Sequence, residues 1–338
     1  MKIAVLGAGS IGCYVGGALL AAGADVVLIG RARMHARIRE HGLLLTDASD
    51  LPIVLAAASV PFSEDPAALA TSDLVLVTVK SADTDAAAAL VARHVRRGAL
   101  VLSLQNGVGN VDRLRAHASG TAAADILAGM VPFNVVQLEN GRLHRGTAGE
   151  LMVETSARLA PWLPLFARAR LPLQQQPDFT AVQWGKLLIN LNNGINALAG
   201  IPLQQQFSNR GYRRCLAALI DEGRGILMAA GIRPAKVVKL GPKLLPHVLR
   251  LPDRVFRRVA APMLRIDPEA RSSMWEDLEA GRRTEVDYLN GAIVTLAESL
   301  GLHAPRNARI VSMIRAAEQG NRTPIEGGRL YQLLMQAS

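Results

Sequence analysis

The first half of the chain alternates short apolar runs with alanine-rich stretches of helical character. The apolar runs are rich in valine, isoleucine and leucine, as buried strands are. They predict strands at 3–6, 25–29, 74–79 and 99–104. The stretches between them predict helices at 11–22, 66–70 and 84–95. Because strands that alternate with helices form parallel sheets with crossover helices, we expect a doubly wound α/β domain of the Rossmann type.

A different strand pattern follows this alternation. Two apolar runs, 126–131 and 150–153, lie on either side of Asn140 and Gly141. Asparagine followed by glycine favours the tight turn of a β-hairpin. We therefore expect an antiparallel addition at the edge of the sheet.

Beyond Pro172 and Pro177 the apolar positions recur at helical spacing. Helices are predicted at 179–198, 211–230, 268–279, 285–300 and 307–319. With 338 residues, half of them apolar, the chain can bury two cores. We therefore expect an α/β Rossmann-type domain at 1–177 and an all-α domain at 178–338.

The segment 231–268 stands apart from these helices because it carries six prolines and many arginines. Proline lacks a backbone donor and interrupts helices, so a continuous helix is not expected here. A loop over the active site is one interpretation, and the sequence leaves the role of the segment open.

The net charge of +10 would suit a polyanionic partner. No zinc-finger, RNP or helix-turn-helix pattern accompanies the charge, and aromatic residues make up only 4% of the chain. We interpret the charge as a solvated basic surface that also attracts an anionic cofactor and substrate, and we expect no nucleic-acid partner.

Composition also bears on metal use and compartment. Cys13 and Cys215 lie far apart, and the seven histidines form no ligand-type cluster, so we expect neither a metal site nor a disulfide framework. The chain shows no signal-peptide pattern and no apolar run of about 18 residues. We therefore expect a cytoplasmic protein without a membrane partner, either a monomer or a homodimer.

A glycine-rich loop directly follows the first predicted strand. Its G-x-G-x-x-G spacing is a weak signal alone, because glycines also mark ordinary turns. Here the loop opens an apolar helix, where glycines let the backbone approach a pyrophosphate and the helix N-terminus supplies amide donors. The predicted dinucleotide-binding residues are Gly7, Ala8, Gly9, Ser10, Ile11 and Gly12.

The end of the second predicted strand indicates which dinucleotide is used. NAD-binding domains usually place an Asp or Glu about 20 residues past the loop, where it binds the ribose hydroxyls. Here Ile29 is followed by Gly30-Arg31-Ala32-Arg33, without a carboxylate. Arginine pairs well with a ribose 2′-phosphate, so Arg31 predicts NADP(H) as the cofactor. A solvated loop is the plainer interpretation of both arginines.

Lys80 and Asn106 follow two further predicted strands. In open α/β sheets ligands bind outside the carboxyl ends of the strands, so both residues are candidates for the binding crevice. Each also has a plainer interpretation, as a surface lysine and as part of a turn with Gly107.

A polar stripe runs along the first predicted helix of the second half. Lys186, Asn190 and Asn193 lie at i, i+4 and i+7, on one face amid leucine and isoleucine. Hydride transfer to a ketone leaves charge on the carbonyl oxygen, which needs a proton donor and fixed hydrogen-bond donors. A lysine is protonated at neutral pH and suits the first role, while asparagine amides can hold substrate groups. A solvated helix face is the plainer interpretation.

A third polar group lies at 272–278 and 284–291. From spacing alone these are two helical segments around Gly281, in which Thr284, Glu285 and Asp287 serve as N-terminal capping residues.

Together these fragments resemble the 2-dehydropantoate 2-reductases, which reduce ketopantoate to (R)-pantoate with NADPH on the route to pantothenate and coenzyme A. The resemblance covers nearly the whole chain and depends on the order and spacing of the fragments. They are the glycine loop, Arg31, Thr78-Val79-Lys80, Asn106-Gly107, Trp184-Gly185-Lys186-Leu187, Ser272-Ser273-Met274 and Thr284-Glu285-Val286-Asp287. The resemblance implies a small 2-oxo acid substrate and a second domain like the C-terminal domain of 6-phosphogluconate dehydrogenase.

The resemblance also implies a role for each matching residue. The glycine loop, Arg31 and Lys80 become cofactor contacts, and Lys186 becomes the general acid. The remaining roles are Asn106 at both nicotinamide and substrate, Asn190 and Ser273 at the substrate, with Ser273 near its carboxylate, and Glu285 beside the cofactor, ordering the polar network.

One position departs from the family pattern. The family commonly has a second substrate-binding asparagine two turns past the lysine, and the ungapped count reaches Gly194. A shift of two residues would make Asn196 the equivalent, but it would require a bulge in the helix. Asn193 faces the stripe on a regular helix. Both asparagines are therefore candidates for substrate binding.

Two other functions stay open. The chain could reduce another branched 2-oxo acid, or it could be a non-catalytic regulator that binds NADPH. A regulator has no need of a proton donor such as Lys186. An opine-type dehydrogenase shares the glycine loop and a helical second domain, but nothing in the sequence indicates amino-acid condensation.

Overall fold

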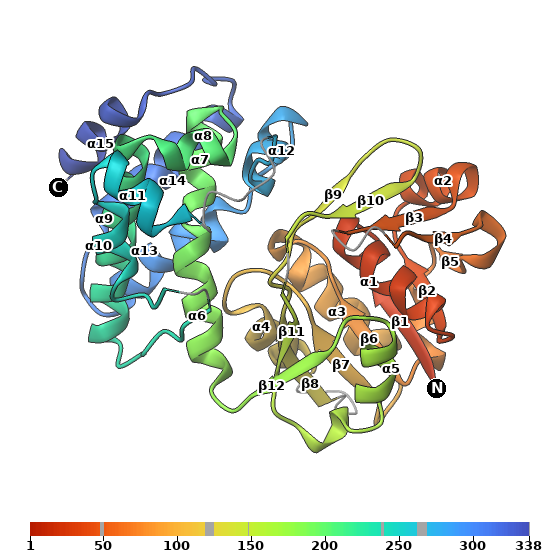
Figure 1. Ribbon diagram of the computed structural model, residues 1–338. Coiled ribbons are helices and arrows are strands. Elements are labelled where there is room, and N and C mark those ends of the chain that lie inside the picture. The colour runs from red at the N-terminus through yellow and green to blue at the C-terminus, as the bar shows by residue number, and fades with distance from the viewer. Residues whose placement is uncertain (48–50, 119–124, 148, 238–239, 262–268, 338) are drawn as a thin grey trace. The chain divides into compact units, whose positions relative to one another are not determined.

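The structure is a computed structural model that describes residues 1–47, 51–118, 125–147, 149–237, 240–261 and 269–337 (Figure 1). The chain divides into two compact units, Met1–Phe179 and Thr180–Ser338. The first unit is built on a mostly parallel sheet and the second is helical, which confirms the predicted fold class.

The main sheet of the first unit has eight strands in the order β12-β11-β8-β7-β6-β1-β2-β5. Their bounds are β1 (Lys2–Leu6), β2 (Asp25–Ile29), β5 (Phe62–Ser63), β6 (Leu74–Val77), β7 (Leu100–Ser103), β8 (Asp125–Met130), β11 (Leu151–Glu154) and β12 (Leu173–Gln176). β1 pairs in parallel with β2 on one side and with β6 on the other. The strand order therefore reverses at β1, and ligands of such sheets bind at this switch point.

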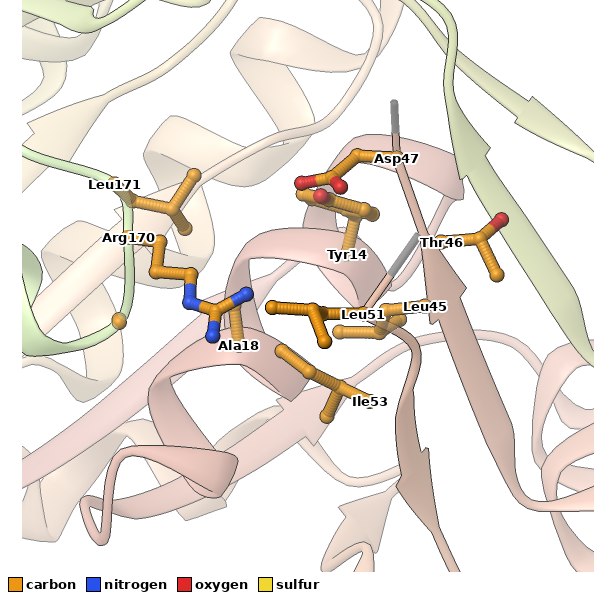
Figure 2. Close-up of a pocket in the computed structure, with 10 residues that line it drawn as sticks. Tyr14, Ala18, Leu45, Thr46, Asp47, Leu51, Ile53, Arg170 and Leu171 are labelled. Carbon is orange, nitrogen blue, oxygen red and sulfur yellow. The ribbon is translucent and has the colours of Figure 1, made fainter. Parts of the chain in front are cut away.

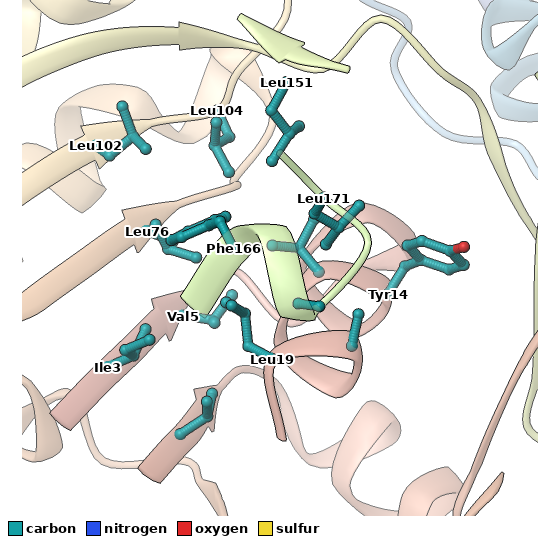
Figure 3. Packing of buried hydrophobic residues seen from close by; sticks show 14 of the residues in the cluster. Ile3, Val5, Tyr14, Leu19, Leu76, Leu102, Leu104, Leu151, Phe166 and Leu171 are labelled. Carbon is teal, nitrogen blue, oxygen red and sulfur yellow. The ribbon is translucent and has the colours of Figure 1, made fainter. Parts of the chain in front are cut away.

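Two layers of helices cover the sheet. The helices of the first unit are α1 (Ser10–Ala21), α2 (Ala32–His41), α3 (Thr84–His94), α4 (Asn110–Ala118) and α5 (Leu163–Arg168). Alternate strand residues such as Ile3 and Leu76 pack with Leu19 of α1 and Phe166 of α5 in one buried cluster (Figure 3). Because crossover connections are right-handed, α3 and α4 lie on the opposite face.

A second, four-stranded sheet has the order β4-β3-β10-β9. Its strands are β3 (Leu43–Thr46), β4 (Ile53–Leu55), β9 (Val135–Gln137) and β10 (Arg142–Arg145). Asn140 and Gly141 have φ values of +52° and +71° and form the tight turn between β9 and β10. The antiparallel addition is confirmed by the pairing of β11 with β8. The predicted turn, however, belongs to this second sheet, because the chain between β8 and β11 forms its own hairpin and pairs with β3.

Short 3-10 helices connect the elements of the first unit. They are η1 (Ala57–Ser59), η2 (Pro66–Thr71), η3 (Ser81–Asp83) and η4 (Ala157–Leu159). The helix predicted at 66–70 is therefore present as η2, and Asp65 caps it by accepting a hydrogen bond from the amide of Ala67.

A buried polar network fixes the loops that follow β6 and β7. Gln105 donates to Thr84 Oγ1 at 2.8 Å, and Thr84 donates to Asn110 Oδ1 at 2.9 Å. Asn110 in turn donates to Ser81 Oγ at 3.2 Å and to the carbonyl of Asn106 at 2.7 Å. Buried polar groups that satisfy one another in this way rigidify the backbone around them. The network therefore positions the backbone of Asn106, whose side chain is exposed.

The second unit consists of helices in its described residues. They are α6 (Phe179–Asn190), α7 (Asn192–Ala199), α8 (Leu203–Ser208), α9 (Arg210–Ala229), α10 (Leu245–Leu249), α11 (Asp253–Val259), α12 (Ser273–Glu279), η6 (Val286–Tyr288), α13 (Asn290–Ser299), α14 (Pro305–Glu318) and α15 (Gly327–Met335). The helix predicted at 179–198 is divided at Leu191, and the one predicted at 285–300 begins as η6 before α13.

A buried arginine attaches part of the proline-rich segment to α9. The Arg213 side chain is fully buried and donates to the carbonyls of Leu249 and Leu251 and to Asp253. Its guanidinium also stacks on Phe256 at 4.0 Å. A buried guanidinium needs such partners, so residues 240–261 are fixed against α9 as two short helices. Residues 238–239 and 262–268 of the segment lie outside the described residues.

Among the described residues, no helix is both long enough and apolar enough to cross a membrane.

We predict that Asn110→Ala lowers the free energy of unfolding by about 1–3 kcal/mol, because it leaves buried partners without a hydrogen bond. Chemical denaturation would measure the loss, and amide exchange in 79–84 and 104–110 should become faster. Asp112→Asn, an exposed change on the same helix, should stay within about 0.5 kcal/mol. Equal stability of the two variants would contradict a positioning role for the network.

Candidate active site

The glycine loop brings α1 into close contact with the end of β1. The amides of Gly7 and Ala8 both donate to the carbonyl of Ile29, at 3.0 and 2.9 Å. Gly7 has a φ of +108°, which strains any residue with a side chain. A Cβ on Gly12 would lie 2.3 Å from the carbonyl oxygen of Gly7. Gly7 and Gly12 are therefore required by the fold itself.

Gly9 differs from the other two glycines of the motif. The nearest atom to a Cβ on Gly9 would be the carbonyl oxygen of Gly7, at 4.0 Å, which is ordinary contact. The helix α1 also begins without a side-chain cap. Since packing does not demand glycine here, the open space at the start of α1 fits the close approach of a pyrophosphate.

Thr78 joins the glycine loop to the end of β6. Its Oγ1 donates to the carbonyl of Gly7 at 2.8 Å, and its amide donates to the carbonyl of Leu6 at 2.9 Å. Lys80 follows two residues later with an exposed side chain. In the sequence, Thr78 stands out only within the family motif Thr78-Val79-Lys80, although a threonine at a strand end beside a glycine loop is a usable signal.

Arg31 lies immediately before α2, close to the glycine loop. A Cβ on the preceding Gly30 would lie 2.7 Å from Cβ of Ala8, so the turn after β2 packs directly on the loop. The Arg31 side chain is 87% exposed, and its Nη2 lies 3.1 Å from a carboxylate oxygen of Asp83. The sequence did not indicate this partner, because 52 residues separate the two in the chain.

Lys186 lies on α6, in the second unit, and is partly exposed, whereas Leu187 and Leu188 beside it in the chain are buried. Burial lowers the pKa of the Lys186 ammonium to about 8. The proline-rich segment lies against this helix: a Cβ on Gly185 would lie 2.3 Å from the carbonyl oxygen of Ala235. Gly185 therefore allows this segment to lie against α6 next to the lysine.

The asparagines that follow Lys186 fall into two groups. Asn190 and Asn193 are partly exposed, whereas Asn192 and Asn196 are buried. Asn196 Nδ2 donates to the carbonyl of Ile201 at 2.9 Å and to Gln206 at 2.8 Å, and its Oδ1 accepts from the amide of Ser272 at 2.8 Å. Both amide hydrogens of Asn196 are therefore committed within the unit. Of the two candidates for the second substrate contact, Asn193 is the one with an accessible side chain.

Gly194 is fixed by its packing against α14. A Cβ there would lie 2.6 Å from Cγ2 of Ile310 and 3.4 Å from Oδ1 of the buried Asn290. An asparagine at this position would require Ile310 to move. Glycine therefore replaces the family's asparagine at a position where the side chain of Ile310 fills the space beside α7.

Ser273 is the first residue of α12, and its side chain is exposed. The preceding Ser272 caps the helix by accepting from the amide of Trp275 at 3.2 Å, and its Oγ donates to the carbonyl of Asn193 at 3.3 Å. Together with the bond from Ser272 to Asn196, this contact joins the start of α12 to α7. Asn193 and Ser273 are thus brought together by Ser272.

Glu285 occupies a separate turn of the second unit. Its carbonyl accepts from the amides of Tyr288 and Leu289 at the start of η6, and its side chain is partly exposed. The preceding Thr284 donates from its amide to Glu318 at 2.7 Å, which ties the turn to α14.

A pocket in the first unit lies between α1, the second sheet and the segment 169–171 (Figure 2). Its lining combines apolar side chains with the charged groups of Asp47 and Arg170 and the hydroxyl of Tyr14. Burial, and secondarily Asp47, raises the pKa of Tyr14. The described residues that line this pocket include none of the predicted cofactor or substrate contacts.

Within the described part of the chain, no cluster of three or more histidine, cysteine, aspartate or glutamate residues could hold a metal ion.

Known proteins resemble the chain over most of its length. A 2-dehydropantoate 2-reductase of Halobacterium salinarum is 29% identical over 326 residues, covering 94% of this chain and 99% of that protein. A PanE/ApbA family ketopantoate reductase from Ralstonia eutropha JMP134 has 31% identity and a TM-score of 0.79, over 94% of this chain and 99% of the other. D-mandelate dehydrogenase in complex with NADH and anilino(oxo)acetate shares the fold, with a TM-score of 0.77 at 18% identity over 94% of this chain and 99% of its own.

Two family models match consecutive parts of the chain. The model of ketopantoate reductase PanE/ApbA matches residues 3–157, and the model of the ketopantoate reductase PanE/ApbA C terminal matches residues 178–318. These matches cover most of both units. The chain therefore belongs to the ketopantoate reductase PanE/ApbA family of oxidoreductases.

Proposed function

We propose that this protein reduces ketopantoate to (R)-pantoate with NADPH, and that Lys186 donates the proton. The observation that carries the proposal is Lys186, which is half-buried on α6 with its pKa lowered to about 8, on a helix that leads to partly exposed amides. A lysine whose ammonium is fully solvated would keep a pKa near the usual 10.5. Perturbed pKa values of this kind cluster at functional sites, and membership of the family supports the reaction type.

The first unit would hold the cofactor, which supplies the hydride when it is bound. The open space at Gly9 and the first amides of α1 would receive the pyrophosphate. Arg31 would pair with the 2′-phosphate of the adenosine ribose through its forked donors. Lys80 and Asn106 follow β6 and β7, and Asn106 would contact both the nicotinamide and the substrate.

Lys186 would complete the reaction at the substrate oxygen. Arrival of hydride at the 2-oxo carbon breaks the carbonyl π bond and leaves an electron pair on oxygen. The ammonium donates its proton there, which gives the 2-hydroxy acid and a neutral amine that regains a proton from water. A pKa of about 8 leaves the group mostly protonated at neutral pH, while it releases the proton more readily than at the usual 10.5.

The other residues of the second unit would bind and orient the substrate. Asn190 and Asn193 present accessible amides, and Ser273 presents a hydroxyl suited to the substrate carboxylate. Asn196 would act as a positioning residue, because its amide joins α7 to the residue that caps α12. Glu285 would order the polar groups beside the cofactor.

A second candidate function is reduction of another branched 2-oxo acid. It is favoured by Gly194, where Ile310 occupies the space that a second amide would need. A substrate with fewer hydroxyl groups than ketopantoate would suit this apolar neighbour.

Initial rates of NADPH and NADH oxidation with ketopantoate and a panel of branched 2-oxo acids test the proposal. We expect kcat/KM for ketopantoate to exceed that of its analogues by roughly tenfold or more, because single groups in a fitted site discriminate by about this factor. Equal rates across the panel would favour the second candidate. Binding of NADPH without turnover of any 2-oxo acid would instead make the protein a regulator.

We predict that Lys186→Met lowers turnover by roughly 10²- to 10⁴-fold and leaves the Kd for NADPH nearly unchanged, since only the proton donor is removed. Because the protonated lysine is the active form, kcat/KM of the unmodified enzyme should fall as pH rises through about 8. The residual activity of the variant should lack this fall. Both are measured by steady-state kinetics across pH.

Lys243→Met is the matched control, because it makes the same substitution at an exposed lysine of the second unit. It should keep the rate and the pH profile of the unmodified enzyme. A Lys186→Met protein that is fully active would remove the lysine from the mechanism.

A further inference from the structure

Asp83 lies at the start of a helix, but its side chain forms an ion pair with Arg31 instead of capping that helix. Asp83 is the N-cap of α3, where aspartate normally accepts a hydrogen bond from an amide of the first turn. It makes no such side-chain bond here. Its carboxylate instead accepts from Arg31 Nη2 at 3.1 Å. The side chain is therefore directed toward the start of α2 rather than toward its own helix.

The pair crosses the carboxyl ends of the central strands. Arg31 follows β2 and Asp83 follows β6, and both strands are neighbours of β1. The glycine loop continues from β1, and Gly30 next to Arg31 packs on Ala8 of that loop. Asp83 thus lies where a dinucleotide on the loop would present its adenosine ribose. The acid that is missing after β2 comes to this place from a different strand end.

We propose that Asp83 limits the preference for NADPH over NADH by competing with the 2′-phosphate for Arg31. The inference rests on the proposed binding of NADPH at the glycine loop. A 2′-phosphate must take Arg31 away from Asp83 before it can pair with the guanidinium, so losing the ion pair reduces the free energy gained on binding. A cofactor without this phosphate leaves the ion pair intact, and its ribose hydroxyls can donate to the carboxylate.

The loop that carries Asp83 does not depend on its carboxylate. The amide of Asp83 donates to the carbonyl of Lys80 at 2.9 Å, and Ser81 Oγ donates to the carbonyl of Asn106 at 3.0 Å. The neighbouring Thr84 belongs to the buried network below. The ion pair itself is 87% and 49% exposed at its two side chains, so solvent screens it and a bound phosphate can displace it.

The test is the binding of both cofactors to the full-length Asp83→Asn protein at low salt, by isothermal titration calorimetry without substrate. We expect the Kd for NADPH to fall about fivefold, which corresponds to about 1 kcal/mol. The Kd for NADH should stay the same or rise. Circular dichroism would verify that the variant is folded.

Asp85→Asn is a matched control on the same helix. Asp85 also forms an exposed pair, but with Arg113 of α4, and the substitution removes the same charge. It should leave the ratio of the two Kd values within about twofold of the unmodified protein, since an exposed ion pair away from the ligand contributes little. An equal shift in both variants would show a general charge effect and overturn the proposal.

Arg31→Ala separates competition from simple repulsion. If Asp83 acts through Arg31, adding Asp83→Asn to Arg31→Ala should give no further gain in NADPH affinity. A full fivefold gain in that background, or no shift in Asp83→Asn alone, would contradict the inference.

These binding measurements need no turnover, so they test the role of Asp83 separately from the proposed reaction. A chain that reduces ketopantoate but shows no shift would overturn only the role of Asp83, and a shift without turnover would overturn only the proposed reaction.

Discussion

The close approach of α1 to the end of β1 is the constraint on which the first unit depends. No Cβ fits at Gly12, because the carbonyl oxygen of Gly7 would lie 2.3 Å from it. This contact sets the start of α1 over the point where the strand order reverses, between β2 and β6. Thr78 then ties the end of β6 to the same loop. The open space at Gly9 lies between these two tightly packed glycines of the loop.

The second unit meets a different constraint, which is the partial removal of a charged group from water. Burial lowers the pKa of Lys186 to about 8, and the Ala235 segment that covers α6 is admitted only because residue 185 is glycine. Beyond the lysine, Asn192, Asn196 and Gln206 satisfy one another and hold the start of α12. The accessible amides and the hydroxyl of Ser273 are left on a rigid support. Under the proposed function, the first unit would supply a cofactor loop, and the second would supply a proton donor and substrate-binding groups.

Local sequence patterns predicted the main elements well where one physical cause dominates. The glycine loop and the apolar strands are such cases, and so is the turn at Asn140 and Gly141. The helix α2 was missed because it is rich in arginine and buries only Ile38, so no apolar period marks it. The choice between Asn193 and Asn196 could not be made from spacing, since it depends on Ser272 and Gln206, which are distant in sequence. The pairing of Arg31 with Asp83 was hidden for the same reason.

The central claim is that a hydride passes from the nicotinamide to the 2-oxo carbon of the substrate. It is tested most directly with NADPH that carries deuterium at C4 of the nicotinamide, prepared in both stereoisomers and supplied with ketopantoate. Mass spectrometry of the product should find deuterium on C2 of pantoate with one stereoisomer and not with the other. Pantoate without deuterium from either stereoisomer, or no pantoate at all, would contradict the account.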